Sequence, residues 1–275
     1  MNKTVGQYKL IKQLKSLIDN DTLPKFMIIV GERGSGRKFI SKDIAKWLNA
    51  TLVECSTKVN DIRDIINLAY KRKEKTVYTI YDADNMSLQA KNSLLKVTEE
   101  PPKNVYFIIT LEDENNTLET IRSRGTVFHM DKYSPSEIGE YAESKYGKED
   151  LPLYKDLCNT CGEVDLLHEL NPQEFYDYVK KVVNHISTVS GANAFKIADK
   201  ISLKDGDDGY DLILFWKCFS KVLFDTRTNM SGIRITDKYL SNLKIRGINK
   251  QMLFDEWLLD IRADWRKRYD NNQTD

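Results

Sequence analysis

A glycine-rich segment directly after a short apolar run is the feature that most constrains the fold. The run is Phe26–Val30, and the segment from Gly31 to Lys38 follows it as Gly-Glu-Arg-Gly-Ser-Gly-Arg-Lys. An apolar strand that leads into glycines and then into an amphipathic helix is the context of a phosphate-binding loop. The first half of the chain continues to alternate apolar runs with amphipathic stretches, which predicts βαβ units and a parallel sheet.

The loop lacks the two side chains that a working phosphate loop uses. In G-x-x-x-x-G-K-[ST], backbone N–H groups and the lysine hold the phosphates, and the hydroxyl ligates Mg²⁺. Gly31 and Gly36 occupy the two glycine positions, with Gly34 between them. Arg37 stands at the lysine position and Lys38 at the hydroxyl position. We therefore predict a degenerate loop with no cofactor.

The third apolar run ends in a second altered motif. A working site of this type ends this strand in Asp-Glu, where the Asp supports Mg²⁺ and the Glu activates water. Tyr81 stands at the Asp position and Asp82 at the Glu position. A shorter acid reaches the attacking water less well, and without metal the phosphate charge is unscreened. The sequence therefore predicts a protein that is not an enzyme.

Composition places the chain among soluble globular proteins. Of its 275 residues, 41% are hydrophobic and 30% are charged, and the net charge is +1. This balance argues against a protein whose whole surface binds nucleic acid. The longest apolar run is far too short to span a membrane. We expect a cytoplasmic protein.

The four cysteines are too few and too scattered for a disulfide framework, which fits a reducing compartment. Cys158 and Cys161 have the spacing of half a zinc site, but no partner pair of Cys or His lies nearby in the sequence. We expect both to be buried small residues and predict no metal site.

Strand patterns fade after the first half of the chain, and helical periodicity replaces them. The predicted strands are Phe26–Val30, Thr51–Cys55, Thr76–Asp82, Val105–Thr110 and Thr126–Met130. Ser87 is a predicted N-cap for a helix running to Glu100, where Pro101 and Pro102 end it. Later helical stretches are Phe175–Thr188, Ala192–Ser202, Tyr210–Asp225, Asp237–Ile245 and Gln251–Arg268.

Four motifs in fixed order carry a family resemblance. They are Asp82–Met86, Ala90–Lys96 with Asn-Ser-Leu-Leu-Lys, Glu99–Pro102, and Ile121–Arg124 with Ser-Arg. In this order they resemble the clamp-loader branch of the AAA+ ATPases, and within it the non-hydrolysing delta-prime subunits of bacterial DNA polymerase III. The motifs cover roughly the first 130 residues.

The resemblance implies an α/β plus all-α architecture in three parts. These are an AAA+ α/β domain with a parallel five-stranded sheet (1–131), a helical lid (132–171) and a C-terminal helical collar (172–275). The aromatic residues of the collar are expected to divide between its core and subunit contacts. They include Phe215, Trp216, Phe219, Trp257 and Trp265.

The resemblance also implies a role for Arg124. It matches the arginine finger of the family's Ser-Arg-Cys motif, which enters the ATP site of a neighbouring subunit, although Gly125 replaces the Cys. In the lid, Asp165 stands where active members carry an arginine that contacts the γ-phosphate. The family function would be that of a stator in a hetero-oligomeric ring that loads a sliding clamp onto primer–template DNA. The implied partners are the other subunits of this ring.

Two alternatives remain open at the level of sequence. One is an active AAA+ NTPase with an unorthodox loop, acting as a helicase loader or nucleotide switch. The other is a DNA-binding module that uses the basic C-terminal helix around Arg262 and Arg266–Arg268.

Overall fold

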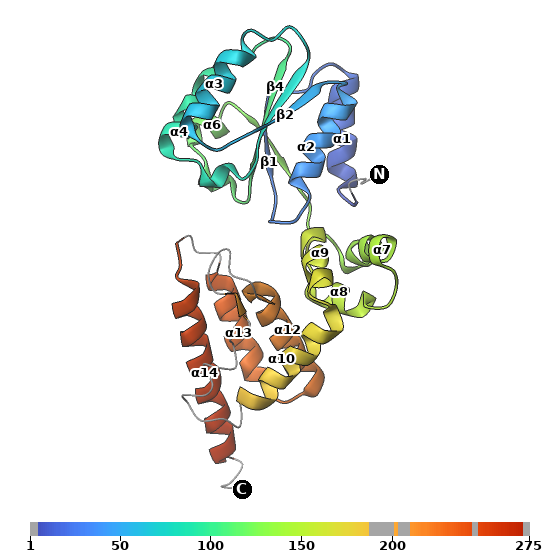
Figure 1. The fold of residues 1–275 in the computed structure, drawn as a ribbon, viewed down its shortest axis with the longest axis vertical. Helices are drawn as coiled ribbons and strands as arrows, with labels where there is room; N and C mark the ends of the chain where they lie inside the picture. Colours follow the sequence, from blue (N-terminus) through green and yellow to red (C-terminus); the bar gives the residue numbers. More distant parts are fainter. Residues whose placement is uncertain (1–4, 187–200, 203–209, 244–246, 272–275) are drawn as a thin grey trace. The chain divides into compact units, whose positions relative to one another are not determined.

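The structure is a computed structural model that describes residues 5–186, 201–202, 210–243 and 247–271. The chain separates into two compact units (Figure 1). The first comprises Met1–Glu137 with Thr160–Gly162, and the second comprises Ile138–Asn159 with Glu163–Asp275. The predicted division at 131 and 171 remains a prediction. At the second of these positions, α10 (Pro172–Ile186) begins directly after Asn171, whose φ is +57°.

The first unit is built on a five-stranded sheet in which every neighbouring pair is parallel. Its order is β2-β3-β4-β1-β5, which confirms the predicted AAA+ parallel five-stranded sheet. The strands are β1 (Phe26–Val30), β2 (Thr51–Cys55), β3 (Thr76–Ile80), β4 (Val105–Leu111) and β5 (Thr126–His129). β3 ends before the predicted Asp82, because that residue has a φ of +51° and turns the backbone.

Helices cover both faces of this sheet (Figure 1). One face carries α1 (Tyr8–Asp19) and α2 (Arg37–Trp47), and the other carries α3 (Val59–Ala69), α4 (Leu88–Ser93), α5 (Leu95–Glu99) and α6 (Glu119–Arg122). Two short 3₁₀ turns, η1 (Ala83–Asn85) and η2 (Glu114–Asn116), follow β3 and β4. Helix α1 was not predicted, although Leu10 and Leu14 have helical spacing and pack against the sheet.

Successive side chains of the central strand enter opposite cores, as the two-residue period of a strand requires. In β1, Ile28 packs toward α3 and α4, whereas Met27 and Ile29 pack toward α1 and α2. All three are fully buried. A strand covered on both faces explains why the run before the glycine loop is continuously apolar.

The predicted helix after Ser87 forms as two short helices, α4 and α5, which meet at Leu94. The hydroxyl oxygen of Ser87 accepts a hydrogen bond from the backbone N–H of Ala90 (3.2 Å), which confirms the predicted N-cap. At the start of α7 (Pro135–Tyr146), Ser134 and Glu137 form a reciprocal capping box.

The second unit is mainly helical. After most of α7 it contains α8 (Leu151–Leu157), α9 (Cys161–Glu169), α10, α12 (Leu212–Thr226), α13 (Met230–Asn242) and α14 (Lys250–Asn271). Short parallel strands β6 (Ile201–Ser202) and β7 (Tyr210–Asp211) pair with each other. The helix predicted over Ala192–Ser202 is therefore wrong at its last two residues, and the rest of it lies outside the described residues. Helix α13 begins earlier than predicted.

Aromatic side chains form the centre of this helical unit. Phe215, Trp216, Phe219 and Trp257 are all fully buried. The indole N–H of Trp257 donates to the hydroxyl of Thr236 (3.1 Å). These four residues therefore belong to the core of this unit, and the division of the collar aromatics between core and subunit contacts stays a prediction. A fifth aromatic, Trp265, remains half-buried.

None of the helices in the described part of the chain is both long and apolar enough to cross a membrane.

We predict that Ser87→Ala lowers the free energy of unfolding by about 1 kcal/mol, because the N–H of Ala90 loses its cap. Ser87→Asp should keep wild-type stability, since Asp caps equally well. Urea unfolding measures both, with Ser93→Ala as the control in the same helix. Equal stability of the Ala and Asp variants would contradict the capping assignment.

Candidate functional site

The glycine loop joins β1 to α2 and adopts a tight conformation. Gly34 and Gly36 have φ values of +81° and +94°, a region that side chains other than glycine rarely adopt. The backbone N–H of Gly162 donates to the carbonyl oxygen of Gly34 (3.0 Å). A Cβ atom on Gly162 would lie 2.6 Å from the Cα of Gly34, so this approach requires glycine. The Tyr133 hydroxyl also donates to the carbonyl oxygen of Ser35 (2.7 Å).

Arg37, the first residue of α2, is held by two carboxylates at the ends of neighbouring strands. Its guanidinium Nη2 lies 3.0 Å from Oδ1 of Asp82, after β3, and 3.5 Å from Oε1 of Glu112, after β4. The arginine side chain is 6% exposed, whereas the two carboxylates are about half exposed. The cation of the loop is therefore neutralised from within the chain.

The second nitrogen of this guanidinium, Nη1, is buried and has no hydrogen-bond partner among the described residues. An unpaired buried donor is unfavourable, because it has lost its water without gaining a partner. Asp82 is itself fixed, because its backbone N–H donates to the hydroxyl of Thr110 (2.9 Å). The pair is thus positioned by the backbone of two strands.

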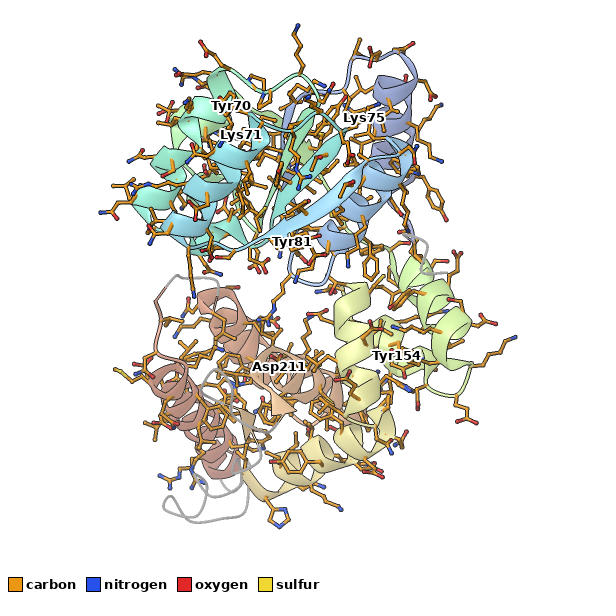
Figure 2. All side chains as sticks on the ribbon, turned by 45° about the horizontal axis from the view of Figure 1, so that its top comes forward. Tyr70, Lys71, Lys75, Tyr81, Tyr154 and Asp211 are labelled. Carbon is orange, nitrogen blue, oxygen red and sulfur yellow. The ribbon has the colours of Figure 1, made fainter. Side chains whose placement is uncertain are left out.

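Tyr81 and Lys38, at the two metal-holding positions of the motif, contact each other (Figure 2 labels Tyr81). The Lys38 ammonium lies 5.0 Å from the centre of the Tyr81 ring, within range of a cation–π interaction. The Tyr81 hydroxyl donates to Glu54 (3.4 Å), whose carboxylate also pairs with Lys42. Burial raises the pKa of Tyr81, and the Glu54 charge raises it further, so the phenol stays neutral.

Glu112 is the member of this group that sequence reasoning missed. The loop that carries it is held by Asp84, whose carboxylate accepts the backbone N–H of Glu112 (2.9 Å) and the side-chain amide of Asn116 (3.0 Å). The ammonium of Lys91, a buried side chain, donates to the carbonyl oxygen of Asn116. The position of Glu112 directly after a buried strand could have indicated that it belongs to this group, because the carboxyl ends of parallel strands meet at the same edge of a sheet.

Arg124 lies two residues after α6, away from this cluster in the sequence, and is 40% exposed. Its guanidinium pairs with Glu99 (3.2 Å) and donates to the carbonyl oxygen of Thr120 (3.0 Å). Gly125 follows, and a Cβ there would lie 2.9 Å from the side chains of Phe26 and Ile28. This crowding accounts for the glycine at the Cys position of the family motif.

Within the second unit, Asp165 joins α9 to α7. Its carboxylate accepts hydrogen bonds from the hydroxyls of Tyr141 (2.8 Å) and Tyr146 (2.9 Å) and pairs with the Lys145 ammonium (2.9 Å). Burial, opposed by Lys145 and reinforced by Asp165, raises the pKa of Tyr141 to about 12. The carboxylate thus has a structural function in the helices of this unit.

The cysteines fit the expectation of structural thiols in part. Cys158 is buried, as expected, whereas Cys161 is half-buried. Burial raises the pKa of both Cys55 and Cys218 to about 12, which keeps these thiols protonated. In the ranges that the structure describes, no group of three or more His, Cys, Asp or Glu side chains could hold a metal ion.

Comparison with known proteins identifies relatives of this chain. The family model described as "DNA polymerase III, delta subunit" matches residues 52–134. The gamma/tau subunit of Mycoplasma genitalium is 29% identical over 56% of this chain and 31% of its own length. A delta-prime subunit from Buchnera aphidicola is 23% identical over 77% of this chain and 73% of its own length. This chain spans between 27% and 54% of the length of three gamma-type relatives.

Solved structures show the same fold. A gamma subunit-related protein of Thermotoga maritima superimposes with a TM-score of 0.55 at 17% identity, covering 93% of this chain and 99% of that one. The Thermotoga maritima RuvB branch-migration motor gives a TM-score of 0.53 at 14% identity, covering 96% and 88%. The ordered motifs, the matched family model and the delta-prime relative agree: the chain resembles the delta and delta-prime subunits of the DNA polymerase III clamp loader, in a fold of the AAA+ type.

Proposed function

We propose that this chain is a non-hydrolysing, delta-prime-like subunit of a DNA polymerase III clamp loader. It would act as a stator in a hetero-oligomeric ring that loads a sliding clamp onto primer–template DNA during replication. It would also offer Arg124 to the ATP site of a neighbouring subunit. The observation that carries this proposal is the contact of Arg37 with Asp82 and Glu112.

The contact opposes nucleotide binding for an electrostatic reason. A phosphate that enters the loop needs the positive charge at the lysine position, and here two carboxylates already neutralise that charge. The same carboxylates repel an incoming triphosphate. A Mg²⁺ ion would screen these carboxylates, but its two protein ligands are replaced by Tyr81 and Lys38. These two side chains contact each other instead.

The surroundings of Arg124 suit a finger that acts outside its own chain. Its ion pair with Glu99 is exposed, with side-chain exposures of 40% and 54%. Exposed pairs of this kind contribute about 0–1 kcal/mol, so the guanidinium can leave Glu99 at small cost when a more concentrated negative charge approaches. The guanidinium Nη1 also donates to the carbonyl oxygen of Thr120 (3.0 Å), so the side chain exchanges one exposed ion pair and one hydrogen bond when it moves to a neighbouring site.

We predict that the purified chain, titrated with ATP or ADP and Mg²⁺ in a calorimeter, gives no binding heat up to about 1 mM nucleotide, where the binding free energy is only about 4 kcal/mol. Micromolar binding, with ATP turnover that Arg37→Ala abolishes, would instead support the alternative of an active AAA+ NTPase acting as a helicase loader or nucleotide switch.

We predict that Arg124→Ala leaves the chain folded and lowers ATP hydrolysis at the neighbouring subunit's site at least about 10³-fold, the range for arginines supplied by a neighbour, so that the reconstituted ring loses the share of its ATPase rate that this site contributes. Arg122→Ala is the matched control, since Arg122 is the last residue of α6, two positions before Arg124, and donates to the side chain of Asn115 within the chain. Steady-state ATPase assays measure both variants. Wild-type ATP hydrolysis by a ring that carries Arg124→Ala would contradict the assignment of Arg124 as an arginine finger.

A further inference from the structure

A second charged surface lies at the end of the sheet opposite the glycine loop. Six exposed cations cluster where β3 and β4 begin, and we name this surface the basic edge. Its members are Lys71, Arg72, Lys73, Lys75, Lys96 and Lys103. Figure 2 shows Tyr70, Lys71 and Lys75 at one end of the first unit and Tyr81, beside the glycine loop, at the other.

Hydrogen bonds hold the segments of the basic edge side by side. The Tyr70 hydroxyl, after α3, donates to the carbonyl oxygen of Glu100 (2.9 Å), after α5. The side-chain amide of Asn104 donates to the carbonyl oxygen of Lys73 (2.7 Å), and the carbonyl oxygen of Asn104 accepts from the N–H of Thr76 (3.0 Å). The cations therefore extend from a fixed backbone rather than from a free loop.

The charges of the basic edge are not balanced locally. Across the described residues, no carboxylate lies within the 4.0 Å ion-pair distance of any of the six cations. Three acids, Glu74, Glu99 and Glu100, occur in the same segments, and Glu99 pairs with Arg124, which leaves an excess of positive charge in a chain whose net charge is +1. The ammonium of Lys96 lies 5.0 Å from the centre of the Tyr70 ring, which leaves its charge in place.

We propose that the basic edge binds the phosphate backbone of a nucleic acid without reading its sequence. Five of the six cations are lysines, which act as hydrated point charges and suit phosphate groups in series. Arginine binds both carboxylates and phosphates with its planar fork, whereas lysine binds phosphate as a point charge, which suits contacts that read no sequence. The one arginine of the set, Arg72, already donates its Nε to the hydroxyl of Tyr78 (3.4 Å). Charge complementarity therefore favours nucleic acid.

This contact goes beyond the clamp-loader role and is independent of it. It involves neither Arg37 nor Arg124, and it belongs to the isolated chain. Failure of this chain to assemble with other subunits would leave the basic edge untouched. Loss of nucleic-acid binding would leave the finger assignment untouched.

The test is the salt dependence of binding by the full chain to a fluorescein-labelled DNA duplex, measured by anisotropy. If five cations neutralise phosphates, the slope of log K against log salt is about −4.5, or about a 500-fold loss of affinity between 50 and 200 mM salt. The triple variant Lys71→Gln/Lys73→Gln/Lys75→Gln should show a slope of about −1.8, or about a 12-fold loss over the same interval.

A control variant removes the same charge elsewhere. Lys12→Gln/Lys148→Gln/Lys180→Gln changes exposed lysines of α1, the segment after α7, and α10, and should keep the wild-type slope. Circular dichroism confirms that both triple variants fold. The proposal is overturned if the wild-type chain leaves the duplex unbound at about 50 mM salt, or if the first triple variant keeps the wild-type slope. Binding of labelled poly-glutamate in preference to the duplex would assign the surface to an acidic peptide instead.

Discussion

The ion pair between Arg37 and the carboxylates of Asp82 and Glu112 is the interaction on which the account of this protein depends. It joins the start of α2 to the ends of β3 and β4, so it connects three elements at the point where a related NTPase would hold phosphate. A buried guanidinium needs negative partners, and here the chain supplies them itself. The loop keeps the backbone geometry that glycine allows, with Gly34 and Gly36 at positive φ, while the positive charge of Arg37 is neutralised by the two carboxylates.

Much of the fold followed from patterns that are local in sequence. Continuous apolar runs and the turns between them predicted all five strands of the sheet, and Ser87 was identified as an N-cap because capping depends on residues three apart. Helix α1 was missed even though Leu10 and Leu14 have the right spacing. The partition of Trp216 and Trp257 between core and surface could not be predicted, because it depends on which helices pack together.

For the site as well, the sequence predicted the residues of local motifs but not the contacts between distant segments. The substitutions at Arg37, Tyr81 and Asp82 can be read from a motif. The contact between Arg37 and Asp82 cannot be read from a motif, because the two residues lie 45 positions apart in the sequence and the sheet brings them together. Glu112 required the strand order, which puts β3 beside β4 and β4 beside β1. The role of Asp165 between α9 and α7 likewise depended on helix packing that no motif describes.

The most direct measurement is anion binding by a chain in which the two carboxylates of the pair are neutralised. Asp82→Asn/Glu112→Gln leaves Arg37 without its negative partners, so calorimetry with inorganic pyrophosphate should detect binding that the wild-type chain lacks. Glu32→Gln is the control, because this loop carboxylate pairs with Lys132 rather than with Arg37. A gain confined to the double variant is the predicted result. Wild-type binding of pyrophosphate, or a folded double variant that still binds none, would contradict the claim that the pair closes the site.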